Sequence, residues 1–153
     1  LSKTDGVRFV MAGSGDKMAE MIDLVAKRGI ADKFHFPGFM RGKQVQEMLA
    51  MSDVYIMPSV SEPFGISPLE AMQVGCPSII SHQSGCAEIL QHAIKTDYWD
   101  IDAMADAIYA IVKYPAMYKS LHELGMAEVN NIKWADAGLK VRRIYDGVIN
   151  HTL

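Results

Sequence analysis

Two glutamates, Glu62 and Glu70, lie on either side of a glycine turn in the most informative stretch of the chain. Upstream, residues 53–57 have the length and apolar composition of a buried strand. Downstream, Ser67-Pro68-Leu69-Glu70 predicts a helix N-terminus, with Ser67 as the cap and Glu70 at the third position. Open α/β sheets bind ligands at such strand–loop–helix junctions. Because ionised carboxylates accept hydrogen bonds from hydroxyl groups, the two glutamates suggest a hydroxyl-rich ligand.

Each glutamate also has an explanation that needs no ligand. At the third position of a helix capped by Ser67, Glu70 would bond the backbone of the cap and favour the helix dipole. Glu62 precedes Pro63 in a loop at the edge of a sheet, where surface glutamates are common. Taken alone, the two glutamates are therefore about equally consistent with a ligand site and with structural or surface residues that bind no ligand.

Strand and helix patterns alternate along the chain, which predicts an α/β fold: a parallel sheet covered by helices on both faces. The expected strands are residues 7–12, 34–36, 53–57 and 77–80, with a weak one at 96–99. The expected helices are residues 16–28, 43–51, 68–74, 86–92 and 101–114, followed by a helical tail that breaks near 130–134. Gly75 is expected to end a helix and Asp100 to cap one. No linker is evident, so we expect a single domain over residues 1–153.

Composition limits the class of protein. The chain has 153 residues, a formal net charge of −3 and 50% hydrophobic residues, which suits one folded domain with a real core. It has no basic cluster of the kind that nucleic-acid binding needs. Its apolar runs are too short to span a bilayer, and residues 1–6 do not have the pattern of a signal peptide. Cys76 and Cys86 are the only cysteines, and no His and Cys residues have metal-like spacing. We therefore expect a reduced, cytoplasmic protein without a bound metal.

Gly13-Ser14-Gly15 follows an expected strand and could begin a dinucleotide-binding fingerprint. Met18 stands in place of the third glycine, and no acid ends the next strand to hold a ribose. The turn could instead be a tight connection, or it could direct the helix start at Asp16 towards a ligand. The chain has neither a Walker lysine nor a nucleophile elbow, so NTPase, hydrolase and protease functions have no support.

The two glutamates, with Pro63-Phe64-Gly65 between them, resemble the E-x7-E signature of retaining glycosyltransferases with the GT-B fold (glycosyl transferases group 1). Residues 53–59 before the pair, and Leu69-Glu70-Ala71-Met72 and Gly75 after it, are similar to the pattern of that family. Three more segments stand in the family's order and spacing: Gly13-Ser14-Gly15, Phe36-Pro37-Gly38-Phe39 and Gly85-Cys86-Ala87-Glu88. The resemblance covers nearly the whole chain. The segment Ser61-Glu62-Pro63-Phe64-Gly65 is most similar to that of glycogen and starch synthase-like members.

The resemblance implies the C-terminal half of a GT-B fold, a Rossmann-like parallel sheet that holds a UDP-, ADP- or GDP-hexose donor. It implies that Glu62 bonds the donor sugar as the catalytic residue, and that Glu70 accepts hydrogen bonds from the ribose hydroxyls. The other implied donor-binding residues are Phe64, Gly65 and Ile66 beside the sugar and phosphates, Gly38, Phe39 and Met40 beside the base, and Gly13 and Gly15. No cofactor and no metal are implied, since the nucleotide sugar is a substrate.

The chain departs from the family in what precedes Leu1. Family members carry there an Arg and a Lys that neutralise the diphosphate, on a strand at the centre of the sheet, and an N-terminal domain that holds the acceptor. We therefore expect the donor-binding domain of a hexosyltransferase, inactive alone, whose sheet closes without its central first strand or borrows a strand. Any peripheral association with a membrane is expected through the missing acceptor domain.

Other functions stay open on this sequence. A domain of the same fold could bind nucleotide sugars or assemble with partners without catalysing transfer. Among enzymes, the alternatives are a sugar-nucleotide epimerase and a phosphorylase-like member of the same fold. The chain shows no lysine context for pyridoxal phosphate, which disfavours the phosphorylase.

Overall fold

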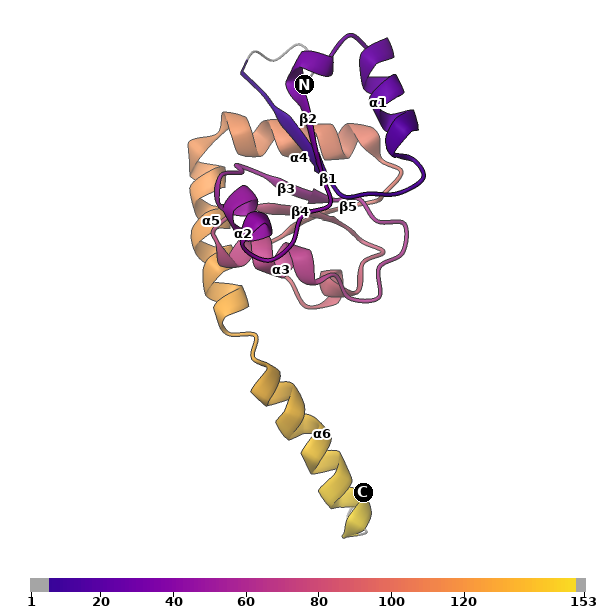
Figure 1. The fold of residues 1–153 in the computed structure, drawn as a ribbon. Helices are drawn as coiled ribbons and strands as arrows, with labels where there is room; N and C mark the ends of the chain where they lie inside the picture. Colours follow the sequence, from indigo (N-terminus) through magenta and orange to yellow (C-terminus); the bar gives the residue numbers. More distant parts are fainter. Residues whose placement is uncertain (1–5, 151–153) are drawn as a thin grey trace. The chain divides into compact units, whose positions relative to one another are not determined.

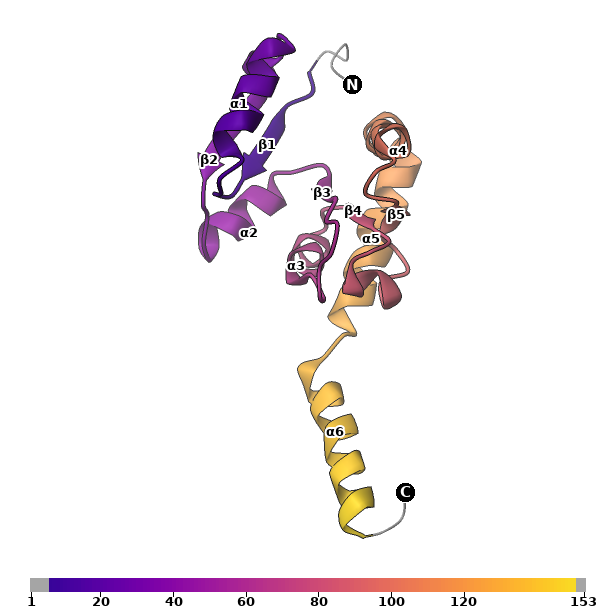
Figure 2. The same cartoon turned by 90° about the vertical axis from the view of Figure 1, so that its right-hand side faces the viewer.

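A computed structural model describes residues 6–150 of the chain (Figures 1 and 2). The chain forms two compact units, Leu1–Met51 and Ser52–Leu153. Every strand pairing in the described residues is parallel. The predicted α/β fold with parallel strands and intervening helices is therefore confirmed.

The first unit contains a two-stranded sheet with its connecting helices. Its elements are, in order, β1 (Phe9–Ala12), α1 (Met18–Lys27), the 3-10 helix η1 (Ala31–Lys33), β2 (Phe34–Gly38) and α2 (Lys43–Ala50). The ring of Phe34 stacks on Phe9 across the sheet at 4.8 Å and on Phe36 along the strand at 5.8 Å, measured between centroids. These stacked rings hold β1 and β2 in register.

The second unit contains a three-stranded sheet. Its elements are, in order, β3 (Tyr55–Met57), α3 (Ile66–Gln73), β4 (Ser78–Ser81), the 3-10 helix η2 (Gly85–Glu88), β5 (Ile94–Thr96), α4 (Ile101–Lys113), α5 (Pro115–Asn130) and α6 (Trp134–Ile149). β4 lies between β3 and β5, and all four of its residues are buried. Since successive side chains of a strand point to opposite faces, β4 is covered on both faces.

The described strands form two sheets rather than one, with the orders β1-β2 and β3-β4-β5. No strand among residues 6–150 pairs with members of both sheets. The expectation that the sheet closes without a central strand is therefore wrong for the described strands. The physical reason is that β1 and β3 belong to different compact units and each pairs only within its own unit.

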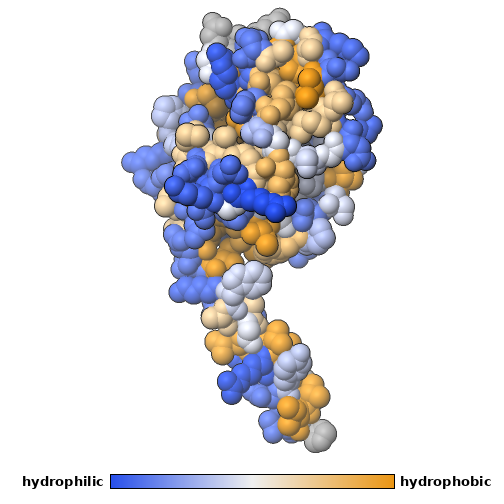
Figure 3. All heavy atoms as spheres, viewed as in Figure 1, coloured by the Kyte–Doolittle hydropathy of each residue, from blue (hydrophilic) through white to orange (hydrophobic). Residues whose placement is uncertain are grey.

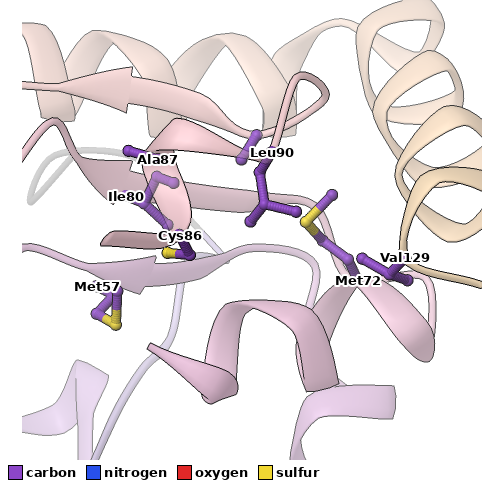
Figure 4. Packing of buried hydrophobic residues seen from close by; sticks show 8 residues of the cluster. Met57, Met72, Ile80, Cys86, Ala87, Leu90 and Val129 are labelled. Atoms are coloured by element: carbon purple, nitrogen blue, oxygen red, sulfur yellow. The ribbon is translucent and has the colours of Figure 1, made fainter. Parts of the chain in front are cut away.

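The core of the second unit lies between the sheet and two helices. Met57 of β3 and Ile80 of β4 belong to one buried cluster with Met72 of α3 and Val129 of α5 (Figure 4). Leu90, from the segment after η2, completes it without any exposed surface. Each fully buried aliphatic side chain of this kind contributes about 1.5–3 kcal/mol of transfer free energy. The packing fixes α3 on the sheet, and α3 follows the loop that carries Glu62.

Two weak elements differ from their predicted positions. The sequence predicts the last strand at residues 96–99, but β5 ends at Thr96. A turn begins at Asp97, whose carbonyl accepts a hydrogen bond from the Asp100 N–H at 3.0 Å. The helix expected at residues 86–92 is only the 3-10 turn η2. Both segments are short, so that their hydrophobic pattern alone does not fix their limits.

Two predicted helix ends are confirmed, the start of α4 and the end of α3. Asp100 caps α4, because its carboxylate accepts a hydrogen bond from the Ala103 N–H at 2.9 Å. Gly75 follows α3 with a φ of +83°, and the next N–H, that of Cys76, donates to the Ala71 carbonyl at 2.9 Å. These features form a Schellman motif, in which glycine adopts the left-handed conformation at low cost.

The last helix, α6, has no buried residue. Apolar side chains recur along it at helical spacing and are exposed, among them Val141, Ile144 and Val148. Figure 3 shows hydrophobic and hydrophilic residues mixed along this helix. The break predicted near residues 130–134 is confirmed by the end of α5 at Asn130 and the start of α6 at Trp134. No helix in the described part of the chain is long and apolar enough to cross a membrane.

Replacing Gly75 by alanine is expected to destabilise the second unit. A Cβ at Gly75 would lie 2.3 Å from Cε1 of His122, whose Nδ1 is 2.7 Å from the Gly75 carbonyl oxygen. We expect a loss of about 1–2 kcal/mol from the left-handed backbone, and a further loss because His122 must move. Chemical denaturation of Gly75→Ala, His122→Ala and the double variant measures both contributions.

The double variant separates strain from collision. If the collision contributes, the double variant loses about 1 kcal/mol less than the sum of the single losses. Strictly additive losses would contradict this account of Gly75.

Candidate functional site

The loop between β3 and α3, residues 58–65, ends at a glycine that no other residue could replace without strain. Gly65 has a φ of +88° and is buried. A Cβ at this position would lie 2.8 Å from Cε of Met57 and 3.2 Å from Cγ of Glu62. The missing side chain therefore lets the loop fold closely onto the end of β3 and lets α3 begin immediately afterwards.

α3 begins two residues earlier than the sequence predicts. Its first residue is Ile66, Gly65 stands at the cap position, and no side chain caps the helix. Ser67, the expected cap, lies within the first turn, and its hydroxyl accepts a hydrogen bond from the Tyr55 hydroxyl at 2.8 Å. The prediction that Ser67 caps the helix is therefore wrong. Ser67 does not cap the helix because the left-handed backbone of Gly65 makes the turn into α3, and because Tyr55 of β3 bonds the Ser67 hydroxyl.

This correction changes the explanation of Glu70. Glu70 is the fifth residue of α3 rather than the third, and its side chain is exposed. A carboxylate this deep in the helix lies beyond the position from which a capping box forms. Within residues 6–150, Glu70 has no hydrogen bond and no ion pair from its side chain. The explanation of Glu70 as a capping residue is therefore removed.

Glu62 is fixed through its backbone and not through its side chain. It forms an isolated parallel bridge with Ser84, and its carbonyl accepts a hydrogen bond from the Gly85 N–H at 2.9 Å. The carboxylate is half-buried, and it has no hydrogen-bond or ion-pair partner in the described part of the chain. A carboxylate held in place in this way keeps its full capacity to accept hydrogen bonds from a ligand.

The two carboxylates create a negative potential around the start of α3. Burial raises the pKa of the Tyr55 phenol, the hydrogen bond with Ser67 lowers it, and Glu70 and Glu62 raise it again. Burial likewise raises the pKa of the Cys86 thiol, and Glu62 adds to that rise. Both glutamates therefore act on the same small region. No group of three or more His, Cys, Asp or Glu within residues 6–150 could hold a metal ion.

Backbone N–H groups lie between the two glutamates. In residues 6–150 we find no acceptor for the N–H groups of Gly65, Ile66 and Ser67. The first N–H groups of any helix lack intrahelical partners and carry the positive end of its dipole. Phe64 and Ile66 have exposed side chains beside these groups, 37% and 58% respectively. The structure thus brings together five of the predicted site residues: Glu62, Phe64, Gly65, Ile66 and Glu70.

The remaining predicted site residues lie in the first unit. Gly13 and Gly38 are neighbours, since the Gly13 N–H donates to the Gly38 carbonyl at 2.8 Å. Both have a positive φ, +140° and +78°. Gly15 lies in the turn before α1, where its carbonyl accepts from Met18 at 3.1 Å, and α1 starts at Met18 rather than at the expected Asp16.

Beyond the end of β2, the side chain of Phe39 is 61% exposed. The guanidinium carbon of Arg41 lies 4.9 Å from the centroid of its ring, which is a cation–π contact. Met40, between them, is half-buried. Phe39 and Met40, with Gly13, Gly15 and Gly38, are the predicted site residues of the first unit.

Sequence reasoning missed the residues that support Glu62. Buried serines at and just after the end of β4, Ser81 and Ser84, connect to the loop that carries it. The available signal was polar side chains at the end of an otherwise apolar strand, next to the glutamate loop. Tyr55 was also missed, although a tyrosine on a buried strand needs a partner for its hydroxyl.

Known proteins match both the sequence and the fold. A family model described as glycosyl transferases group 1 matches residues 1–126. An uncharacterised glycosyltransferase of Methanocaldococcus jannaschii is 40% identical over 87 residues, which are 57% of this chain and 22% of the relative. N-acetyl-alpha-D-glucosaminyl L-malate synthase of Bacillus anthracis is 31% identical over 120 residues, 76% of this chain and 31% of the relative. The chain thus spans about a third or less of the length of these curated relatives.

The fold comparison agrees. The structure of HepE from Anabaena in complex with UDP-glucose matches with a TM-score of 0.82 at 17% identity. The match covers 94% of this chain and 42% of that one. At this identity the match establishes the fold, which is that of the GT-B glycosyltransferases.

Replacing Gly65 by alanine is expected to destabilise the second unit by about 1–2 kcal/mol, because the left-handed backbone disfavours a Cβ that would also collide with Met57. The matched control is Gly138→Ala in α6, where a Cβ would meet no atom within 4 Å and alanine favours the helix. Denaturation in urea measures both. Equal stability of Gly65→Ala and the parent would contradict this account of the loop.

Proposed function

The chain belongs to the glycosyl transferases group 1 family, and from this premise we propose that it is the donor-binding domain of a retaining hexosyltransferase. One observation carries the proposal. Two glutamates that have no protein partner in the described residues flank a helix start whose N–H groups are also without acceptors. A nucleotide sugar has hydroxyl groups for the carboxylates and phosphates for the N–H groups.

In this proposal the two glutamates bind different parts of the donor. Glu62 accepts hydrogen bonds from the hydroxyl groups of the transferred hexose and is the catalytic residue. Glu70 accepts hydrogen bonds from the ribose. The half-buried position of Glu62 and the exposed position of Glu70 support a sugar held deeper in the site than the nucleoside.

The diphosphate lies against the start of α3. Transfer breaks the bond between the anomeric carbon and a phosphate oxygen, so negative charge develops on the leaving nucleoside diphosphate. The N–H groups of Gly65 and Ile66 and the helix dipole stabilise that charge. We infer that this arrangement serves in place of a divalent metal, and that the acceptor attacks the same face that the diphosphate leaves, without a covalent bond to Glu62.

The proposal also includes the donor-binding residues that the family resemblance implies in the first unit. These are Gly38, Phe39 and Met40 for the base, with Gly13 and Gly15. We propose residues 1–153 as the nucleotide-sugar-binding part of the enzyme. The UDP-glucose bound to the HepE neighbour supports a uridine nucleotide and a hexose as the first donor to test.

The remaining parts of the enzyme lie outside this chain in our proposal. The chain spans 22% and 31% of the two relatives, which leaves room for an acceptor domain in proteins of their length. Both cysteines are free and buried, which supports a reducing compartment such as the cytoplasm. A domain that binds nucleotide sugars without catalysing transfer is the second candidate.

Donor binding distinguishes the two glutamates. In the full-length protein, Glu62→Gln is expected to weaken the binding of UDP-glucose about tenfold and to leave UDP binding unchanged, since UDP has no hexose. Glu70→Gln is expected to weaken both ligands alike, since both contain the ribose. Calorimetric titration measures these affinities, with ADP- and GDP-glucose as alternatives if UDP-glucose does not bind.

The matched control is Glu123→Gln, an exposed glutamate on α5 that pairs with Lys119 at 3.8 Å, away from the site. It is expected to bind both ligands as the parent does. Unchanged affinity in all three variants would overturn the assignment of the site.

A transfer assay tests the rest of the proposal. The full-length protein is expected to transfer the hexose at the same rate with and without EDTA, because no metal takes part. Residues 1–153 alone are expected to show no transfer, because the acceptor site lies elsewhere. Loss of activity in EDTA would contradict the metal-independent mechanism. Transfer by residues 1–153 alone would contradict the proposal that the acceptor site lies outside this segment. Donor binding without any transfer by the full-length protein would favour the non-catalytic candidate.

A further inference from the structure

Three serines link the loop of Glu62 to the end of the central strand. Ser81, the last residue of β4, is fully buried, and its hydroxyl donates to the carbonyl of Ser59 at 2.6 Å. Ser84 is 2% exposed, and its hydroxyl lies 2.8 Å from that of Ser81. A serine hydroxyl has one proton, which Ser81 gives to Ser59, so Ser84 is the donor in the second bond. The chain of bonds therefore runs from Ser84 through Ser81 to the glutamate loop.

The backbone after Ser84 continues the same attachment. Gly85 N–H donates to the Glu62 carbonyl at 2.9 Å, and Cys86 N–H donates to the Phe64 carbonyl at 2.6 Å. With the Ser59 carbonyl, three carbonyls of the loop that precedes Gly65 are thus bonded from β4 and the segment after it. The loop has no regular secondary structure apart from its bridge to Ser84. Its conformation is therefore set by these bonds.

Gly85 allows the two segments to approach this closely. A Cβ on Gly85 would lie 2.1 Å from the carbonyl oxygen of Pro63 and 3.1 Å from Cα of Phe64. The φ of Gly85 is not in the left-handed region, so the close approach is the only local reason for glycine here. The segment that bears the serines thus lies directly against Pro63 and Phe64, the two residues that follow Glu62.

We propose that Ser81 and Ser84 are positioning residues, a buried pair of hydroxyl groups that holds the Glu62 carboxylate in register with the hexose of the donor. The inference rests on the proposed function of Glu62. Neither serine touches the donor: each acts through the Ser59 carbonyl and the loop. Catalysis is sensitive to such placement, because a shift of about 1 Å in a reacting group lowers the rate by up to about a hundredfold.

Ser78 provides a matched control on the same strand. It is as completely buried as Ser81, but it stands at the other end of β4. Its hydroxyl faces the carbonyls of Pro68 and Cys76 at 3.5 and 3.4 Å, and neither residue belongs to the glutamate loop. Ser78→Ala therefore removes the same chemical group from the same strand without touching the link to Glu62.

The experiment compares Ser81→Ala, Ser84→Ala and Ser78→Ala in the full-length protein, with UDP-glucose as donor and UDP as the sugar-free ligand. Ser81→Ala is expected to lower kcat about tenfold, because the Ser59 carbonyl loses its donor, and to leave the affinity for UDP within about twofold. Ser84→Ala is expected to have a smaller effect, since the bond from Ser81 to Ser59 stays. Ser81→Thr, which keeps the hydroxyl, is expected to restore kcat, and Ser78→Ala to retain it.

Thermal unfolding of each variant is measured alongside, because a structural role alone would lower stability in Ser78→Ala and Ser81→Ala alike. If Ser81→Ala does not fold, Ser84→Ala carries the test. The inference is overturned if the variants of Ser81 and Ser84 keep the kcat of Ser78→Ala. It is also overturned, together with the proposed function, if Glu62→Gln measured in parallel has the activity of the parent. Loss of activity in Glu62→Gln with full activity in both serine variants refutes the positioning role alone.

Discussion

The close packing of Gly65 onto the end of β3 is the constraint on which the site depends. With a φ of +88° and no room for a Cβ beside Met57, this residue turns the chain from the loop into α3 within one position. As a result the helix starts at Ile66, and Ser67 turns to Tyr55 instead of capping. For the same reason Glu70 is the fifth residue of the helix rather than the third. A single backbone conformation thus determines which N–H groups and which carboxylates remain available to a ligand.

The polarity of the site follows from what surrounds that turn. Burial raises the pKa of the Tyr55 phenol, and the two carboxylates, which have no protein partner in the described residues, add to that rise. The phenol donates a hydrogen bond to the Ser67 hydroxyl. The positive end of α3 lies between the same two carboxylates. A ligand that offers both hydroxyl groups and phosphates satisfies each of these groups, whereas a simple cation or a simple anion satisfies only one kind.

The order of helices and strands was predictable, because the spacing of hydrophobic residues and the residues typical of helix ends indicate it directly. Asp100 and Gly75 were assigned correctly, since each fixes a helix end through a local bond or a local backbone conformation. The start of α3 was not predictable in the same way. Ser67-Pro68-Leu69-Glu70 matches a capping box, but the left-handed backbone of Gly65 starts the helix two residues earlier, and the Tyr55 hydroxyl bonds Ser67.

The support of Glu62 was hidden for a similar reason. Ser81 and Ser84 lie about twenty residues after the loop in the sequence. The Ser81 hydroxyl bonds the loop, and the Ser84 hydroxyl bonds Ser81, because β4 pairs with β3. The division of the strands into two sheets also depends on pairing between distant segments, which no local pattern encodes. Residue types near one another in the sequence therefore identified the glutamates, but not the structure that fixes them.

The most direct test of the central claim is a crystal structure of the full-length protein with UDP-glucose bound. We expect a Glu62 carboxylate oxygen within about 3 Å of a hexose hydroxyl and a Glu70 oxygen within about 3 Å of a ribose hydroxyl. The diphosphate is expected against the N–H groups of Gly65 and Ile66. A bound donor that contacts neither glutamate would contradict the account.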